Sequence, residues 1–319
     1  MESLQYSLNA TMPVFLVMVV GWVLMKIGML DNRQFLSVAN KFIFNVSLPL
    51  MLFTDMMNTD LKTDLDVKLI VYSAVITTIA FALIWICARL FIKDKSMIGA
   101  FVQAAYRSSI AVLGVSFMTN IYGSAGLIPM IIIGSVPLYN IYAVIVLTVE
   151  GEDSREITDK KQIAKKAAVG VAKNPIIIGI VLGTLASLAG LQLPTIISKA
   201  VDSIANICSP LSLIVIGASF EGKKALAKVA PAAICAAVKL IVLPAAFLFP
   251  AVLWFGFRDE ALTALIIMLG SPTTPSCYIM AKNMKNDSVL TSSVIAMTTL
   301  LSSVTLTFWI FIMRYLGYI

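Results

Sequence analysis

Ten stretches of mostly apolar residues, each about 20 residues or longer, follow one another along the chain with short polar connections between them. A helical run of this length matches the hydrocarbon core of a bilayer. Barrel strands would instead alternate apolar and polar residues over about ten positions. The pattern therefore predicts an all-α membrane protein with about ten transmembrane helices. We place these segments near residues 8–28, 36–56, 67–91, 97–119, 124–149, 170–190, 194–220, 227–255, 260–283 and 288–316.

The charge content supports the same class of protein. Only 13% of the residues are charged and 59% are hydrophobic, whereas a soluble domain carries about 25% charged residues. The net charge of +7 comes from Lys and Arg in the short connections, which does not favour nucleic-acid binding. The chain has no histidine, and its four cysteines lie in apolar runs without metal-ligand spacing. We therefore expect no cofactor, no metal and no enzyme activity.

The distribution of positive charge predicts the orientation in the membrane. Seventeen Lys and Arg residues lie beside connections that follow odd-numbered segments, against five on the other side and two within segments. Because cytoplasmic loops carry the excess of positive charge, the odd connections are predicted to be cytoplasmic. We expect a multi-pass protein of the cytoplasmic (inner) membrane with both termini outside. Membrane lipid is then a necessary partner.

The longest connection divides the chain into two halves. Residues 1–149 contain the first five segments, residues 150–168 form a cytoplasmic loop, and residues 169–319 contain the other five. The loop is acidic at its start and basic later, which predicts a solvated connector that ends as an amphipathic helix at the membrane surface. A regulatory role is the alternative.

Matching residues in the two halves indicate an internal repeat. At an offset of 161, the sequence NVSLPL falls on NICSPL, so that Asn45 and Pro49 match Asn206 and Pro210. At an offset of 162, Pro13, Gly21 and Gly28 match Pro175, Gly183 and Gly190. Because each half has an odd number of segments, the two copies would enter the membrane from opposite sides. Inverted repeats of this kind build many secondary transporters.

Segments four and nine contain helix breakers and small polar residues at equivalent places in the two halves. In segment nine, Pro272 and Pro275 flank Thr273 and Thr274. Each proline removes a backbone donor, and the freed carbonyls must find partners within the protein, water or a ligand. Broken helices at corresponding positions are typical of a transporter's binding site. A simple kink in a packed helix is the structural alternative.

Two cations lie within predicted spans. Arg107 is followed by Ser108 and Ser109 in segment four, where a buried guanidinium is costly and predicts a partner such as a carboxylate. The alternatives are that Arg107 reaches the cytoplasmic surface or pairs with a carboxylate of the protein. Lys239 in segment eight is either a second cation of the site or a structural partner of carbonyls.

Asn45 and Asn206 are neutral polar residues at membrane depth, and Pro49 and Pro210 follow them. We expect these residues to bend the scaffold and to bond neighbouring helices, or alternatively to line the pathway. The carboxylates near membrane depth lie at segment ends, so the sequence identifies no coupling ion.

The motifs resemble those of the auxin efflux carrier family, which includes the plant PIN carriers and bacterial organic-anion carriers, and we interpret the chain as a bacterial member. The matching pieces, which extend over nearly the whole chain, are FNVSLPLMLF, YRSSIAVLGVSF with NIYG, NPIIIGIVLG, KLIVLP and SPTTPSCYIMAKNM.

The resemblance implies the fold of the bile acid–sodium symporters. In that fold two inverted five-helix repeats form a scaffold from helices 1, 2, 6 and 7, often dimeric, and a moving transport domain from helices 3–5 and 8–10. Broken helices four and nine cross, and the substrate lies against the crossing in an elevator-like mechanism. The chain departs from the family pattern at Ser108–Ser109 and at Val115–Ser116, so the first break is expected to depend on Gly114 rather than on a proline.

The predicted function is secondary transport of a small organic anion, either a mono- or dicarboxylate or an aromatic acid. The alternatives are a sodium- or proton-coupled symporter of a neutral or amphipathic solute, a channel, and a membrane-embedded enzyme or sensor. The predicted binding residues are Arg107, Ser108, Ser109, Gly114, Thr273, Thr274, Pro275, Ser276, Cys277 and Lys239.

Overall fold

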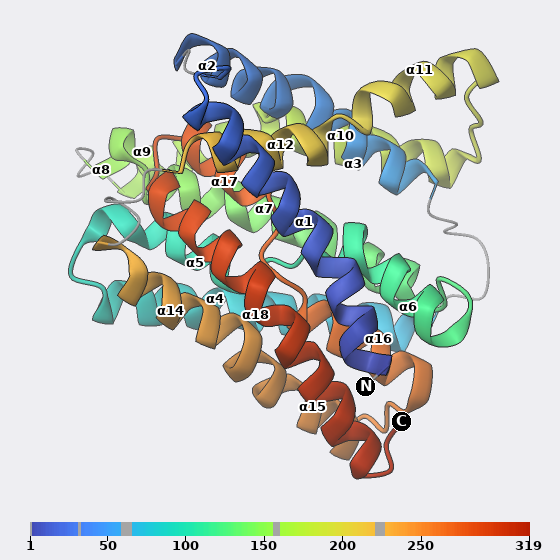
Figure 1. Cartoon of the computed structure of the whole chain (residues 1–319). Helices are drawn as coiled ribbons and strands as arrows, with labels where there is room; N and C mark the ends of the chain where they lie inside the picture. The colour runs from blue at the N-terminus through green and yellow to red at the C-terminus, as the bar shows by residue number, and fades with distance from the viewer. Residues whose placement is uncertain (1, 31–32, 59–65, 156–159, 221–226) are drawn as a thin grey trace.

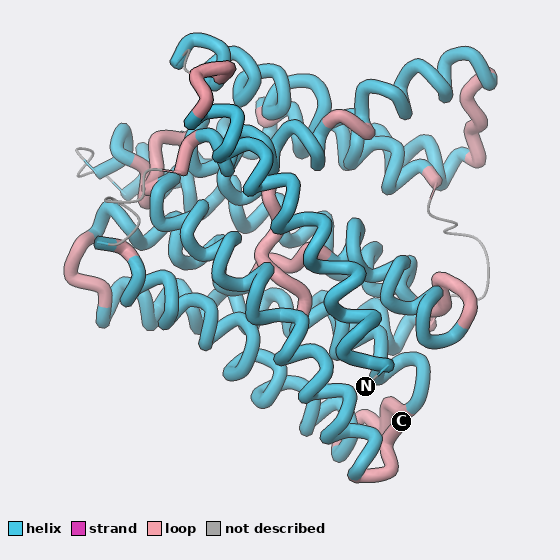
Figure 2. Tube along the Cα trace, viewed as in Figure 1, coloured by secondary structure: helices cyan, strands magenta, loops and turns pink. Residues whose placement is uncertain are grey.

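The computed structural model describes residues 2–30, 33–58, 66–155, 160–220 and 227–319, and every regular element in these ranges is a helix (Figure 1 and Figure 2). The prediction of an all-α chain is confirmed. The elements in chain order are α1 (Glu2–Lys26), α2 (Arg33–Phe42), η1 (Ile43–Ser47), α3 (Leu48–Met57), α4 (Val67–Phe91), η2 (Lys95–Met97), α5 (Ile98–Tyr106), η3 (Ile110–Gly114), α6 (Val115–Tyr122), α7 (Ile128–Val149), α8 (Glu152–Arg155), α9 (Lys160–Lys173), α10 (Pro175–Ala189), α11 (Thr195–Ala205), α12 (Cys208–Ala218), α14 (Val229–Ala237), η4 (Val238–Val242), α15 (Leu243–Leu253), α16 (Asp259–Gly270), α17 (Ser276–Asn283) and α18 (Ser288–Tyr315).

Six helical stretches in the described ranges are long and apolar enough to cross a membrane. They correspond to predicted segments two, three, five, seven, eight and ten, and run over Gln34–Met57, Val67–Phe91, Ile128–Val149, Thr195–Ala218, Val229–Leu253 and Ser288–Tyr315. The apolar part of α1 is shorter, and α10 is bent by 55° from the helix before it. Segments four and nine are interrupted, as the next subsection describes. The chain is therefore a multi-pass membrane protein, while the count of ten crossings stays a prediction.

The long helix α4 shows how these elements meet lipid and protein on opposite faces. Asp66 caps its first turn by accepting a hydrogen bond from the backbone N–H of Leu69, over 2.9 Å. Val75 and Leu83 lie on its exposed face, whereas Ile76 and Ile84 are buried. Large aliphatic side chains on an exposed helix face are stable in hydrocarbon and costly in water. This face of α4 is accordingly a lipid-facing surface.

Glycines allow two helix pairs to pack closely. Helix α1 lies along α12, and a Cβ at Gly217 would overlap the carbonyl of Met18. Helix α10 lies along α3, and a Cβ at Gly179 would overlap the carbonyl of Pro49. Small residues permit such backbone contacts between membrane helices, where van der Waals packing is the main attraction. Predicted segment one thus pairs with seven, and six pairs with two.

The helices form two groups on opposite sides of the molecule. Figure 1 shows α2, α3, α10 and α11 along one edge and α4, α14 and α15 along the other. Within the second group, α4 packs on α7 and α5, and α14 packs on α18. The interrupted helices α5–α6 and α16–α17 belong to this second group and bring their breaks into its interior.

The two predicted scaffold asparagines do not bond neighbouring helices in the described part of the chain. The side chain of Asn45 is exposed, and its amide donates to the carbonyl of Lys41 in its own helix, over 2.8 Å. Asn206 is also exposed and ends α11. A π-helical turn precedes Pro49, and a turn at Asn206 precedes Pro210, so both irregularities begin before the proline. The prediction that Asn45 and Asn206 bond neighbouring helices was therefore wrong.

Candidate functional site

Predicted segment four is broken at Arg107–Ser109. Helix α5 ends at Tyr106, and Arg107 has an extended backbone with φ −74° and ψ 145°. The π-helical turn η3 then begins at Ile110 and leads into α6. Gly114 lies at the end of η3 with helical dihedrals, so the expectation that the break depends on this glycine was wrong. Its lack of a side chain instead admits Ile110 and Ile128, whose side-chain carbons would lie 2.8 and 3.2 Å from a Cβ.

Predicted segment nine is broken at the equivalent place. Helix α16 ends at Gly270, Ser271 has an extended backbone with φ −66° and ψ 150°, and α17 begins at Ser276. Both prolines lie in or beside this break. Pro272 is within the extended stretch, and Pro275 is the residue before α17, where its missing N–H costs no helical bond. The structure thus contains two broken helices at the positions where the sequence has its breakers.

The two breaks contact each other directly. The backbone N–H of Ser109 donates to the backbone carbonyl of Pro272, over 3.0 Å. The hydroxyl of Thr273 donates to the carbonyl of Ala104, over 2.8 Å, and the backbone N–H of Thr273 donates to the hydroxyl of Thr298 on α18, over 3.2 Å. These bonds satisfy groups that each break frees, which is the condition for irregular backbone at membrane depth.

Arg107 lies at this crossing with only 2% of its surface exposed. Its Nη2 donates to Oδ1 of Asn140 on α7, over 3.0 Å, and to the hydroxyl of Ser276, over 2.9 Å. Its Nη1 donates to the thioether of Met280, over 3.0 Å. Its Nε, in contrast, is buried without a hydrogen-bond partner. The guanidinium therefore keeps an unused donor.

All the partners of this guanidinium are neutral. Ion pairs between described residues lie elsewhere, as in Arg89 with Glu150, Lys285 with Asp153, and Lys228 with Asp94 and Asp287. A buried charge without an opposite charge is strongly destabilising. The thioether is also only a weak acceptor. In the described part of the chain, Arg107 therefore neither pairs with a carboxylate of the protein nor reaches the surface.

Lys239 is a second buried cation beside the crossing. It lies in the π-helical turn η4, has 0% exposure, and donates from Nζ to the carbonyl of Leu269, over 3.1 Å. Leu269 is in the last turn of α16, where unpaired carbonyls carry partial negative charge. Arg107 directly follows the last residue of α5, and its guanidinium bonds α7 and α17 rather than the carbonyls of α5. Each broken helix therefore has a cation at the end of its first half.

Two hydroxyls and one amide oxygen at the crossing lack hydrogen-bond partners. They belong to Ser108, Ser271 and Gln103, and all three side chains are buried. The hydroxyl of Thr274 lies 3.2 Å from that of Ser276. Unsatisfied buried polar groups are costly and mark places where a water or ligand binds. The crossing thus offers both donors and acceptors around Arg107.

The structure brings most of the predicted residues together. Arg107, Ser109, Thr273 and Ser276 bond across the two breaks, and Cys277 accepts the amide of Gln103 at its carbonyl, over 2.9 Å. Lys239 is connected to the crossing through the bond from its Nζ to the carbonyl of Leu269, near the end of α16.

Sequence reasoning missed Gln103, Asn140 and Met280. Gln103 and Asn140 are single amides within apolar helices, and this isolation was the available signal. Met280 gave no such signal, because methionine is a common core residue in membrane helices.

Long apolar helices around two broken ones that meet in the interior define a multi-pass membrane protein of the transporter class. A family model described as "Membrane transport protein" matches residues 6–310, and the chain belongs to this family. The predicted resemblance to the auxin efflux carrier family is thereby confirmed. The chain is also 24% identical over 309 residues to a protein of Methanothermobacter thermautotrophicus described as an uncharacterized transporter, with 95% of this chain and 97% of the relative covered.

Proposed function

We propose that this protein is a secondary carrier for a small organic anion, a mono- or dicarboxylate or an aromatic acid, and that the anion binds at Arg107. The observation that carries this proposal is a buried guanidinium with neutral partners only and an unpaired Nε. A substrate carboxylate would supply the missing negative charge. The start of α17 at Ser276 adds backbone N–H groups with partial positive charge to the same place.

The geometry of Arg107 indicates how a carboxylate would bind. Nε and Nη2 form one edge of the planar guanidinium fork, which matches the two oxygens of a carboxylate. Nε is free, whereas Nη2 donates to Asn140 and Ser276. A carboxylate that takes both donors would replace one of these two neutral acceptors. Charge-assisted bonds are about twice as strong as neutral ones, so the exchange favours the anion.

The proposed transport mechanism is elevator-like: one group of helices carries the substrate and moves relative to the other group, which forms the scaffold. The pairs α1–α12 and α10–α3 are equivalent under the sequence repeat, which supports two inverted five-helix units and a scaffold made from predicted helices 1, 2, 6 and 7. The crossing of the broken helices belongs to the other group, helices 3–5 and 8–10. A homodimer through the scaffold, and an inner-membrane location with both termini outside, belong to the same proposal.

The contacts at the crossing favour the anion carrier over a cation-coupled symporter of a neutral solute. A sodium ion needs free carbonyl or carboxylate oxygens. The carbonyls of Pro272, Ala104 and Cys277 each accept a hydrogen bond, and that of Leu269 accepts one from Lys239. The amide oxygen of Gln103 and the hydroxyls of Ser108 and Ser271 have no partner among the described residues, but all three groups are neutral. The guanidinium of Arg107 is permanently charged and lies among these groups, which favours a negatively charged ligand over a second cation.

The proposal is tested by thermal unfolding of the purified protein against a panel of organic acids. A ligand that binds only the folded state raises its apparent stability by mass action. We expect a carboxylate to stabilise the parent protein and an Arg314→Ala variant, in which an exposed arginine is removed, but not an Arg107→Ala variant. If sodium or a neutral solute stabilises all three proteins and no acid does, the anion carrier is excluded.

A further inference from the structure

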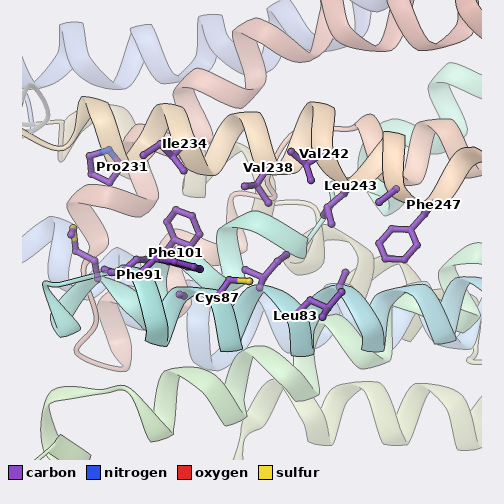
Figure 3. Close-up of a pocket in the computed structure, with 16 residues that line it drawn as sticks. Leu83, Cys87, Phe91, Phe101, Pro231, Ile234, Val238, Val242, Leu243 and Phe247 are labelled. Atoms are coloured by element: carbon purple, nitrogen blue, oxygen red, sulfur yellow. The ribbon is translucent and has the colours of Figure 1, made fainter.

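An apolar cavity of about 410 Å³ lies between α4–α5 and the helix formed by α14, η4 and α15. Figure 3 shows Leu83, Cys87 and Phe91 of α4 facing Ile234, Val238 and Val242 across it. Its lining side chains carry no oxygen or nitrogen, and the sulfurs of Cys87 and Met97 are their only heteroatoms. None of the residues that bond Arg107 lines the cavity.

The cavity opens toward the lipid-facing surface. Leu83 and Val242, which line it from opposite walls, are 54% and 53% exposed. A bilayer offers only hydrocarbon at this depth, and an apolar cavity without polar partners does not hold water. The occupant that matches the cavity is therefore a hydrocarbon chain.

The length of the cavity fits a chain from one leaflet. Its lining on α4 runs from Ala80 to Phe91, which is about 17 Å at 1.5 Å per residue. Half of a bilayer's hydrocarbon core is about 15 Å. A second cavity, of about 840 Å³, continues along the same helices from Val67 to Ile79 and shares Ala246 and Phe247 with the first. The seam between α4 and the helix formed by α14, η4 and α15 therefore contains two cavities that meet near mid-depth, one at the level of each leaflet.

Positive charge lies at the outer end of the first cavity. Lys93 follows the last lining residues of α4, is exposed, and makes no hydrogen bond or ion pair with a described residue. The neighbouring Lys228, just before α14, is instead paired with Asp94 and Asp287, and Lys95 donates to two backbone carbonyls. Lys93 is therefore the cation available to a headgroup, and cations near a membrane surface attract anionic lipids.

We propose that this cavity is a binding site for an anionic phospholipid, with an acyl chain between α4 and α14–α15 and the phosphate at Lys93. The lipid would fill the seam between these helices and remain with them. The site is independent of the anion site at Arg107, so failure of either proposal leaves the other in place.

The test uses the full chain, purified in mild detergent with equal amounts of phosphatidylglycerol and phosphatidylcholine, and counts retained lipids by native mass spectrometry. We expect one retained phospholipid, with phosphatidylglycerol favoured about tenfold. Leu83→Trp and Val242→Trp, which obstruct the cavity from opposite walls, should each lose it. Ile86→Trp changes a residue of similar exposure, 57%, that does not line the cavity, and should retain it.

Lys93→Gln should keep the lipid but lose the preference for phosphatidylglycerol, whereas Lys41→Gln, an exposed lysine on α2, should keep both. The proposal is overturned if the Leu83, Val242 and Ile86 variants retain equal lipid, if no phospholipid is retained, or if the preference survives Lys93→Gln.

A labelling experiment on the parent protein tests the site without any substitution, so that misfolding of a variant cannot explain the result. Cys87 lines the cavity and is exposed, whereas the other three cysteines are buried. Phosphatidylglycerol should slow labelling of Cys87 by N-ethylmaleimide several-fold more than phosphatidylcholine does at the same concentration. Equal rates with both lipids contradict the site.

Discussion

The backbone N–H of Ser109 donates to the backbone carbonyl of Pro272 over 3.0 Å, and this bond joins the breaks of two helices from opposite halves of the sequence. Pro272 has no N–H of its own, so its carbonyl is the group through which it can bond within the crossing. A backbone group that one break leaves without a helical partner is in this way hydrogen-bonded to a backbone group of the other break. The two breaks are therefore expected to form together.

Removing this N–H is expected to destabilise the crossing. Ser109→Pro deletes the donor and leaves the buried carbonyl of Pro272 unpaired, which costs about 1–3 kcal/mol. Ser109→Ala keeps the backbone bond and serves as the control. Thermal unfolding in detergent should show a clearly lower midpoint for the proline variant alone. Equal midpoints for the two variants would show that the bond contributes nothing.

Asn140 is expected to hold Arg107 in place when no anion is bound. Asn140→Ala removes the oxygen that accepts from Nη2, and a lost bond to a charged group costs about 1.5–3 kcal/mol. Asn45→Ala removes an exposed amide that bonds its own helix and should change stability by less than about 0.5 kcal/mol. Chemical or thermal unfolding of both variants measures the difference. Indistinguishable variants would mean that Asn140 does not support the guanidinium.

A saturating anion should reduce the effect of Asn140→Ala, because the ligand replaces the missing acceptor. The stability gap between the variant and the parent is therefore expected to narrow with ligand. A gap that is unchanged at saturation would place the ligand away from Arg107.

The sequence predicted the helices well because their signal is local. An apolar run of about 20 residues is present in the sequence whatever the neighbours are, and the six continuous spans lie within a few residues of the predicted ones. The positions of breaks are less local. Gly114 was the predicted breaker of segment four, but the chain leaves the helix at Arg107. Bonds between the two breaks, from Ser109 to Pro272 and from Thr273 to Ala104, replace the helical ones there.

The residues around Arg107 were only partly predictable for the same reason. Ser276 was found because it neighbours two prolines, whereas Asn140 is the single amide of α7, a helix whose sequence shows no break. The prediction for Asn45 was wrong in the opposite direction, because it gave this residue a contact that the described part of the chain does not contain. Its match with Asn206 suggested bonds between helices, yet in the chain by itself the amide bonds its own helix. Which face of a helix is covered depends on packing, which the sequence does not state.

The glycines of the paired helices are expected to be intolerant of a methyl group. A Cβ at Gly217 or at Gly179 would overlap a backbone carbonyl, which cannot move as a side chain would. Gly217→Ala and Gly179→Ala should therefore each cost about 1–3 kcal/mol, as overpacking does. At Gly170 the nearest atom is the hydroxyl of Thr148, 3.3 Å away, so Gly170→Ala is the matched control. Unfolding midpoints that are equal for all three variants would contradict the close packing of these pairs.

Ser96 is expected to affect stability in a manner that depends on pH. Bonds from the hydroxyl and the backbone N–H of Ser96 hold the pKa of Asp94 below its usual value, with a smaller contribution from Lys228. A lowered carboxyl pKa contributes stability above the ordinary value of about 4, and this contribution is lost as the pH falls through the folded-state pKa. Ser96→Ala should thus destabilise more at pH 7 than at pH 3.

The size of this effect is small because Asp94 is half exposed, and about 0.5 kcal/mol or less is expected. In an Asp94→Asn background, Ser96→Ala should have little effect at either pH. Unfolding midpoints at the two pH values measure both differences. A destabilisation of equal size at pH 7 and pH 3 would show that Ser96 acts independently of the Asp94 charge.

Lys239→Met is expected to separate a structural from a binding role of the second buried cation. The substitution keeps a long side chain and removes a buried amine that makes no ion pair with a described residue. It also leaves the carbonyl of Leu269 without the donor from Lys239. Loss of the charge is stabilising and the unpaired carbonyl is destabilising, so the net change in the free energy of unfolding should be within about 1 kcal/mol. The anion, however, loses a nearby positive charge, and its Kd should rise about tenfold, which corresponds to about 1.4 kcal/mol.

Lys68→Met is the matched control, because Lys68 also donates to a backbone carbonyl, that of Phe255, but is exposed. It should leave the Kd unchanged. If Lys239→Met instead lowers stability strongly and leaves the Kd of the stabilising acid unaltered, Lys239 serves only to hold the end of α16, and the positive charge that the anion meets comes from Arg107.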